Sequence, residues 1–203
     1  MSAHTQAVSH LPLVNVTAAT AAEICRYLYL EKEALQLLHP AMNPREFVAA
    51  LREKKQYPAG IDFMAHALPA RAAIWWGCLC LQHTCGDKLE PWERVACKAA
   101  VQWVLQPNEA NRVAASRPAD VVGLGSPAGA LAAAVNQTGG NLAPPSGPPI
   151  PPSPFAPARA VAIAVKVAST KGDRSRIQAT QRSFIELGIA IAEGRFPPPG
   201  FSQ

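Results

Sequence analysis

The sequence predicts an all-α fold, which we expect to be a compact, irregular bundle of about eight to ten short helices with a proline-rich extended strap. Almost half of the residues are apolar (49%) and only 16% are charged, so the chain can bury a core. Its 38 alanines favour helices, and its 20 prolines end them. No stretch shows the alternation of apolar and polar residues between turn signals that predicts a strand.

The composition also predicts how the chain is organised. Residues 1–19 are mostly small or polar and are expected to form a flexible N-terminal arm. Residues 20–195 are expected to form a single helical domain that includes the proline-rich strap, residues 144–157. Residues 196–203, which contain three consecutive prolines, form the predicted C-terminal tail. One domain is typical for a chain of 203 residues.

Capping signals predict the first two helices. The sequence Thr-Ala-Ala-Glu at 20–23 is a capping box, and apolar residues continue from it at helical spacing as far as the His-Pro sequence at 39–40. The sequence Asn-Pro-Arg-Glu at 43–46 is a second helix start, with asparagine as the cap and proline in the first position. Two lysines at 54–55 end this helix favourably, because cations stabilise a helix C-terminus.

The middle of the chain predicts the centre of the fold. The Pro-Ala-Gly sequence at 58–60 is expected to break the chain before a short helix over 61–68. In the next predicted helix, 69–85, the segment 74–81 is apolar on nearly every face. A helix that is hydrophobic all round belongs in a core. Pro91 opens a further helix that reaches residue 105.

The second half of the chain predicts four more helices. An amphipathic helix is expected over about 107–122, and a second over 128–135 after a Gly-Leu-Gly turn. Between 144 and 157, eight of fourteen residues are proline, which predicts extended polyproline geometry. A final pair of helices is expected over about 157–170 and 173–194.

Four residues within the central helix have the types that bind zinc: Cys78, Cys80, His83 and Cys85. Residues two apart on a continuous helix point about 200° away from each other, so Cys78 and Cys80 cannot bind one ion. We therefore expect the thiols to pack in the core, and we predict no metal, no cofactor and no enzymatic activity. His66 and His83 are expected to be partly buried. A metal or redox protein built on the four residues is kept as an alternative.

Aromatic side chains are the candidate partner-binding residues, because aromatics are favoured at interface hot spots; they are Trp75, Trp76, Trp92 and Phe155. Adjacent helical residues point about 100° apart, so one of Trp75 and Trp76 can face outward. The strap either docks on a partner's aromatic groove or packs over this chain's own tryptophans, with Ile150 and Phe155 as apolar anchors. We favour the second interpretation.

Charge and cysteine content predict the compartment and exclude two kinds of partner. The net charge is +5, and its excess lies in residues 158–203. The short basic run at 171–176 is interrupted by Asp173 and has no interleaved aromatics, so no nucleic acid is predicted as a partner. No apolar run approaches the roughly 20 residues of a membrane span. Five cysteines without framework spacing indicate a reducing compartment, and we expect a cytoplasmic protein.

Three segments carry a resemblance to a known family. The sequence HALPARAAIWWGCLC at 66–80, together with GPPIPP at 147–152 and ARAV at 158–161, resembles an uncharacterised family of bacterial proteins associated with gene neighbourhoods of type VI secretion systems. The resemblance spans roughly residues 20–195. It implies a cytoplasmic accessory role, such as helping to load or fold a secreted effector, and it implies no activity and no functional residues.

These observations give one hypothesis and two alternatives. We hypothesise a non-enzymatic adaptor that presents an apolar groove or aromatic patch to another protein, which can be a secretion-system component or an effector. The proline-rich strap would cover or complete that groove. The alternatives are an immunity protein that neutralises a toxic effector and the Cys/His metal or redox protein. The oligomeric state is left open.

Overall fold

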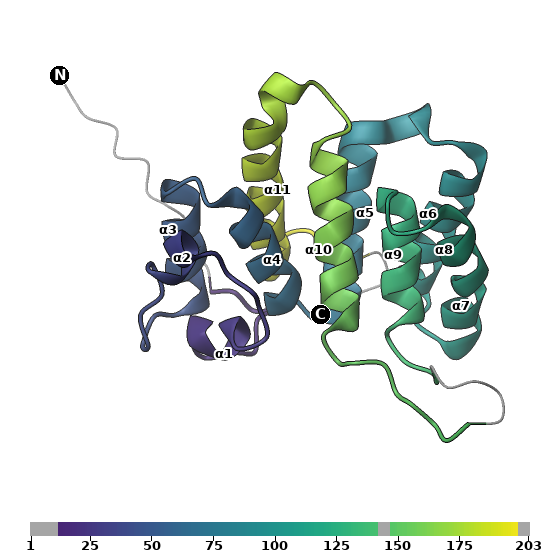
Figure 1. Ribbon diagram of the computed structural model, residues 1–203, viewed down its shortest axis with the longest axis horizontal. Coiled ribbons are helices and arrows are strands. Elements are labelled where there is room, and N and C mark those ends of the chain that lie inside the picture. Colours follow the sequence, from purple (N-terminus) through teal and green to yellow (C-terminus); the bar gives the residue numbers. More distant parts are fainter. Residues whose placement is uncertain (1–11, 142–146, 199–203) are drawn as a thin grey trace.

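A computed structural model describes residues 12–141 and 147–198, and all regular structure in these two ranges is helical (Figure 1). The all-α prediction is therefore confirmed. Two short 3₁₀ helices, Gly86–Lys88 and Arg174–Arg176, accompany the α-helices. The α-helices are α1 (Ala21–Cys25), α2 (Lys32–Leu35), α3 (Pro44–Glu53), α4 (Tyr57–Ala67), α5 (Ala70–Cys85), α6 (Pro91–Leu105), α7 (Glu109–Ala114), α8 (Ser116–Val122), α9 (Pro127–Asn136), α10 (Ala156–Ser169) and α11 (Ile177–Ala192).

The helices are arranged in three groups (Figure 1). Helices α1, α2 and α3 lie at one side of the molecule, and α6 to α9 lie at the other. Between them stand α4, α5, α10 and α11. Helix α10 packs against α4, α5, α9 and α11, so it joins the middle group to the rest of the core.

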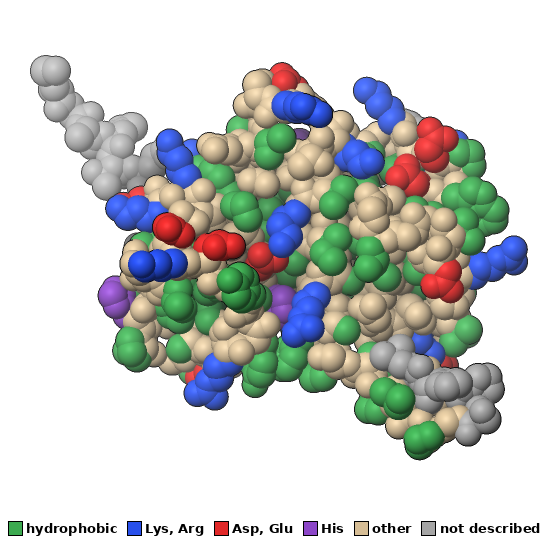
Figure 2. All heavy atoms as spheres, in the orientation of Figure 1, with side chains coloured by type: hydrophobic (Ala, Val, Ile, Leu, Met, Phe, Trp, Pro, Cys, Tyr) green, Lys and Arg blue, Asp and Glu red, His purple; other side chains and the backbone are tan. Residues whose placement is uncertain are grey.

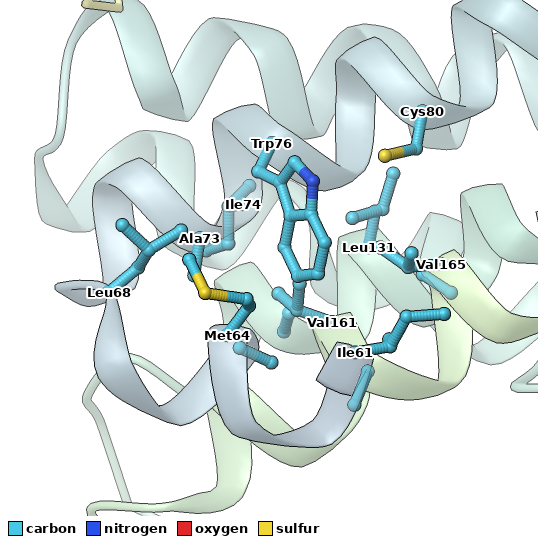
Figure 3. Close-up of a cluster of buried hydrophobic side chains, with 14 of the residues drawn as sticks. Ile61, Met64, Leu68, Ala73, Ile74, Trp76, Cys80, Leu131, Val161 and Val165 are labelled. Atoms are coloured by element: carbon cyan, nitrogen blue, oxygen red, sulfur yellow. The ribbon is translucent and has the colours of Figure 1, made fainter. Parts of the chain in front are cut away.

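Helix α5 is the central apolar helix that the sequence predicts. The Trp76 ring is completely buried and lies among Met64, Leu131 and Val161, which come from α4, α9 and α10 (Figure 3). Its indole N–H donates to the Phe184 carbonyl at 2.8 Å, so the one polar atom of the ring is paired. Helix α5 is closely packed on two sides, against α9 and against α11.

Two glycines permit this close packing. A Cβ on Gly77 of α5 would overlap the Leu131 side chain. A Cβ on Gly188 of α11 would lie 3.2 Å from the Trp76 ring. Small residues at these points let α9 and α11 approach α5, and larger side chains would force the helices apart.

The capping signals place several helix starts correctly. The Asn43 side chain accepts from the Glu46 N–H at 3.0 Å, and the Glu46 carboxylate accepts from the Asn43 N–H at 2.9 Å. This is a complete capping box. At α1 the box is half formed: Thr20 accepts from the Glu23 N–H at 3.3 Å, but the Glu23 carboxylate accepts from the N–H of Ala19.

Part of the predicted N-terminal arm, residues 12–19, is attached to α11 by hydrogen bonds. The Asn15 backbone N–H donates to the Ala192 carbonyl at 2.9 Å, and its side-chain amide donates to the Ile191 carbonyl at 2.8 Å. Both carbonyls belong to the last turn of α11, where a helix leaves carbonyls without intrahelical partners. Residues 1–11 lie outside the described residues.

Helical spacing failed to predict three boundaries. Residues 20–38 form two helices, α1 and α2, and residues 26–31 between them are not α-helical. The predicted break at 58–60 is instead the first turn of α4, where Pro58 loses nothing because the first N–H groups of a helix have no partner. The helix predicted over 107–122 is divided into α7 and α8, because Pro118 cannot continue a helix from the preceding turn.

Candidate functional site

The structure does not bring the four predicted partner-binding residues into one surface. Trp76 is 0% exposed and lies in the core, so the expectation that it contacts a partner conflicts with its burial. Trp75 is half-buried on α5, and its indole nitrogen is buried without a hydrogen-bond partner among the described residues. Trp92 is 52% exposed in the first turn of α6. Phe155 is half-buried and directly precedes α10.

Two adjoining hollows share Tyr27 and His66, and we call the pair the Tyr27 groove. The first hollow, about 470 Å³, lies between residues 27–31, α4 and α10. The second, about 370 Å³, lies between residues 17–18, α1 and Phe155. In Figure 2, acidic, basic and histidine side chains gather around a recess near the middle of the face, where α4 and α10 lie in Figure 1.

An aromatic stack contributes two rings to this groove. The rings of Tyr27 and Phe155 stack with their centroids 3.8 Å apart and their planes at 18°. Phe155, which we predicted to anchor the strap on the tryptophans, therefore contacts a tyrosine instead. The second predicted anchor, Ile150, is 50% exposed, and residues 148–151 of the strap are all exposed, whereas Pro157 at its end is buried. Each of its prolines lacks an N–H, which limits the backbone bonds that would hold it down.

His66 lines both hollows and has one ring nitrogen without a hydrogen-bond partner among the described residues. Its Nδ1–H donates to the Asp62 carbonyl at 2.8 Å, as one turn of α4 allows. Burial lowers the pKa of His66, the hydrogen bond and charge of Asp62 oppose this shift, and the charges of Arg159 and Lys166 add to it. The lowered pKa favours the neutral imidazole, whose Nε2 is an acceptor. That atom is buried and has no hydrogen-bond partner within the described ranges.

The charges around the first hollow are only partly paired. The Lys166 ammonium contacts the Asp62 carboxylate at 2.7 Å, which joins α10 to α4. The Arg159 side chain is exposed and makes no ion pair or side-chain hydrogen bond with the rest of the described chain. Glu31, at the start of α2, contributes a carboxylate on the other wall. The groove therefore offers separate positive and negative groups beside an aromatic surface.

The cysteines contribute to the core. Cys78 and Cys80 are 4% and 0% exposed, as predicted, and burial raises the pKa of both thiols. Such thiols stay protonated at neutral pH and are poor nucleophiles. His83 is exposed, which contradicts the expectation of partial burial; only one edge of its ring meets Phe184. Within the part of the chain that the structure describes, no three His, Cys, Asp or Glu side chains are grouped to hold a metal ion.

Sequence reasoning missed most of the groove. Tyr27 and Tyr29 were assigned to a continuing helix, yet both tyrosines lie in the non-helical segment after α1. Tyrosine has a weaker helix propensity than alanine or leucine, so two tyrosines within three residues could have marked this departure. Nothing in the sequence marked Arg159 as a groove residue, because a single arginine near a helix start is common.

The fold and the groove define an all-helical protein with an aromatic and charged surface groove. The chain belongs to a family of unknown function, DUF6931, which matches residues 47–192. No curated protein and no solved structure matches the chain. Tyr27, Tyr29 and Glu31 precede the matched residues, whereas His66 and Arg159 lie within them. None of the helices formed by the described residues has both the length and the apolar character that crossing a membrane requires.

Proposed function

We propose that this chain is a non-enzymatic protein-interaction protein that binds a segment of a partner protein in the Tyr27 groove. The observation that carries the proposal is the aromatic surface beside a recess. Tyr29 is 89% exposed and Tyr27 is 46% exposed, and both line the first hollow. Tyrosine is enriched at protein interfaces, where it buries a large ring and keeps a polar hydroxyl.

The shape of the groove favours a protein segment over a compact small molecule. Two hollows adjoin through Tyr27 and His66, so the recess is extended along α1, α4 and α10. The Tyr29 ring is largely exposed at the edge of the first hollow. A protein segment that covers the hollow would bury this ring more readily than a small molecule bound within the hollow. The Tyr27–Phe155 stack fits the expectation that the end of the strap completes the groove.

We further propose a cytoplasmic accessory role in a bacterial type VI secretion system. The free thiols of all five cysteines support a reducing compartment. The resemblance of residues 66–80 and 147–161 to proteins from such gene neighbourhoods supports the system. Under this proposal the partner is a secretion-system component or an effector.

Affinity capture from the native host tests the proposed surface. Tagged wild type, Tyr29→Ala and Trp92→Ala are compared by quantitative mass spectrometry. Both substitutions remove one exposed aromatic ring, and Trp92 lies on α6 away from the groove. We expect one protein to be captured by wild type and Trp92→Ala and reduced at least tenfold by Tyr29→Ala. If only Trp92→Ala fails to capture the partner, the interface lies on α6 and not in the Tyr27 groove. If the captured protein is a single toxic effector, the result supports the immunity alternative.

A further inference from the structure

Arg159 lines the first hollow of the Tyr27 groove together with Lys166, Asp62 and Glu31, and its guanidinium forms no ion pair within the described residues. Lys166 is occupied by Asp62 at 2.7 Å, and these two side chains are only 36% and 24% exposed. Arg159 lies seven residues before Lys166, so both side chains project from the same face of α10. The Arg159 guanidinium is exposed and has no acidic partner within the described residues.

The position of Arg159 increases its attraction for an anion. It lies in the first turn of α10, where the helix dipole adds positive potential. Guanidinium groups bind carboxylates through two parallel hydrogen bonds, which gives direction as well as attraction. Glu31 lies on the opposite wall, in the segment that follows Tyr29, so the negative charge is displaced from the α10 side.

We propose that Arg159 selects partner segments that carry an acidic side chain, with its carboxylate bound to the guanidinium in the first hollow. This inference rests on the proposed function, because it specifies what the Tyr27 groove binds. The apolar part of the segment packs on Tyr27 and Tyr29.

Peptide selection tests the preference whatever the identity of the partner. A random library of linear twelve-residue peptides displayed on phage is selected on immobilised full-length wild type, Arg159→Glu, Lys98→Glu and Tyr29→Ala. Lys98→Glu is the matched control, since it makes the same charge change at an exposed position on α6. Circular dichroism first confirms that all four proteins are folded.

We expect wild type and Lys98→Glu to enrich peptides with Asp or Glu at a recurring position by at least threefold over the library. Arg159→Glu should lose this enrichment and favour Lys or Arg instead. For a selected synthetic peptide, replacing its acidic residue by the amide should weaken binding at least fivefold to wild type, and less than twofold to Arg159→Gln.

The outcomes separate the two proposals. The role of Arg159 would be overturned if the selected peptides depend on Tyr29 but show no preference for acidic residues. It would also be overturned if the peptides selected on Arg159→Glu show the same acidic preference as those selected on wild type. Both outcomes would leave the Tyr27 groove as the binding site. If no selected peptide depends on Tyr29, the proposed function fails, and the inference about Arg159 fails with it.

Discussion

The N-terminal region, residues 12–56, packs on the helical core, residues 57–195, through apolar contacts and also through ion pairs. The centre of the core, around the buried Trp76 ring, is apolar. The N-terminal region contributes the buried Phe47, whose ring meets Phe63 edge to face, and ion pairs add to this apolar attachment. Arg45 pairs with Glu193 at 2.6 Å, and Arg52 pairs with Glu186 at 3.0 Å.

This attachment matters because the Tyr27 groove lies where the two regions meet. Tyr27 and Tyr29 come from the N-terminal region, whereas His66 and Arg159 come from the core. We therefore expect a small change in how the N-terminal region is attached to alter the groove while the centre of the core stays intact. Under this expectation, core stability and binding competence can be changed separately.

The largest expected effect tests the core. Trp76→Ala removes a completely buried ring and leaves the Phe184 carbonyl without its indole donor. We expect a loss of about 3–5 kcal/mol in the free energy of unfolding, measured by urea denaturation. Trp92→Ala is the control, because its half-exposed ring should cost less than about 0.5 kcal/mol. Equal losses for the two variants would contradict the central place of α5.

The next effect tests the attachment of the N-terminal region. The Glu193 side chain is 1% exposed and contacts both Arg45 and Arg195. Glu193→Gln leaves these guanidinium groups without their carboxylate, and we expect a loss of about 2 kcal/mol. Limited proteolysis should show faster cleavage within residues 12–56 than within the core. Uniformly faster cleavage would show that the two regions unfold together.

The contribution of the Glu193 carboxylate should also depend on pH, and we expect this effect on the free energy of unfolding to be smaller. Burial by itself would raise the pKa of Glu193, but hydrogen bonds from Arg45 and Arg195 outweigh burial and lower it from 4.5. The folded state therefore favours the ionised form. This stabilisation is complete above the unfolded pKa and is lost as the pH falls through the lowered folded pKa.

Urea unfolding of wild type and Glu193→Gln at a series of pH values between about 6 and 3 measures this contribution. The wild type should lose stability more steeply below about pH 4.5, because only it has a carboxylate to protonate at this position. Curves with the same slope would show that Glu193 does not contribute to the acid sensitivity.

The smallest effect tests the stack that joins the strap to the N-terminal region. A double-mutant cycle with Tyr27→Leu and Phe155→Leu should give a coupling of about 0.5–1.5 kcal/mol, because each variant keeps an apolar side chain and loses the ring pair. The free energy of unfolding is the measured quantity. A coupling of zero would mean that the strap is held elsewhere.

Local sequence determined the helix starts and the central helix. The prolines that open α3, α6 and α9 act within one turn of themselves, so no distant residue is needed to place them. The uniformly apolar segment 74–81 predicted burial for the same reason, since its own composition leaves no polar face.

Only the tertiary structure decided where the chain departs from helical spacing and which side chains meet in the groove. Isolated helices as short as α1 are marginal, so tertiary contacts such as the Tyr27–Phe155 stack decide how the chain continues after it. Phe155 lies 128 residues after Tyr27, and Glu193 lies 148 residues after Arg45. Contacts over such separations depend on how the helices pack, which no local pattern in the sequence encodes.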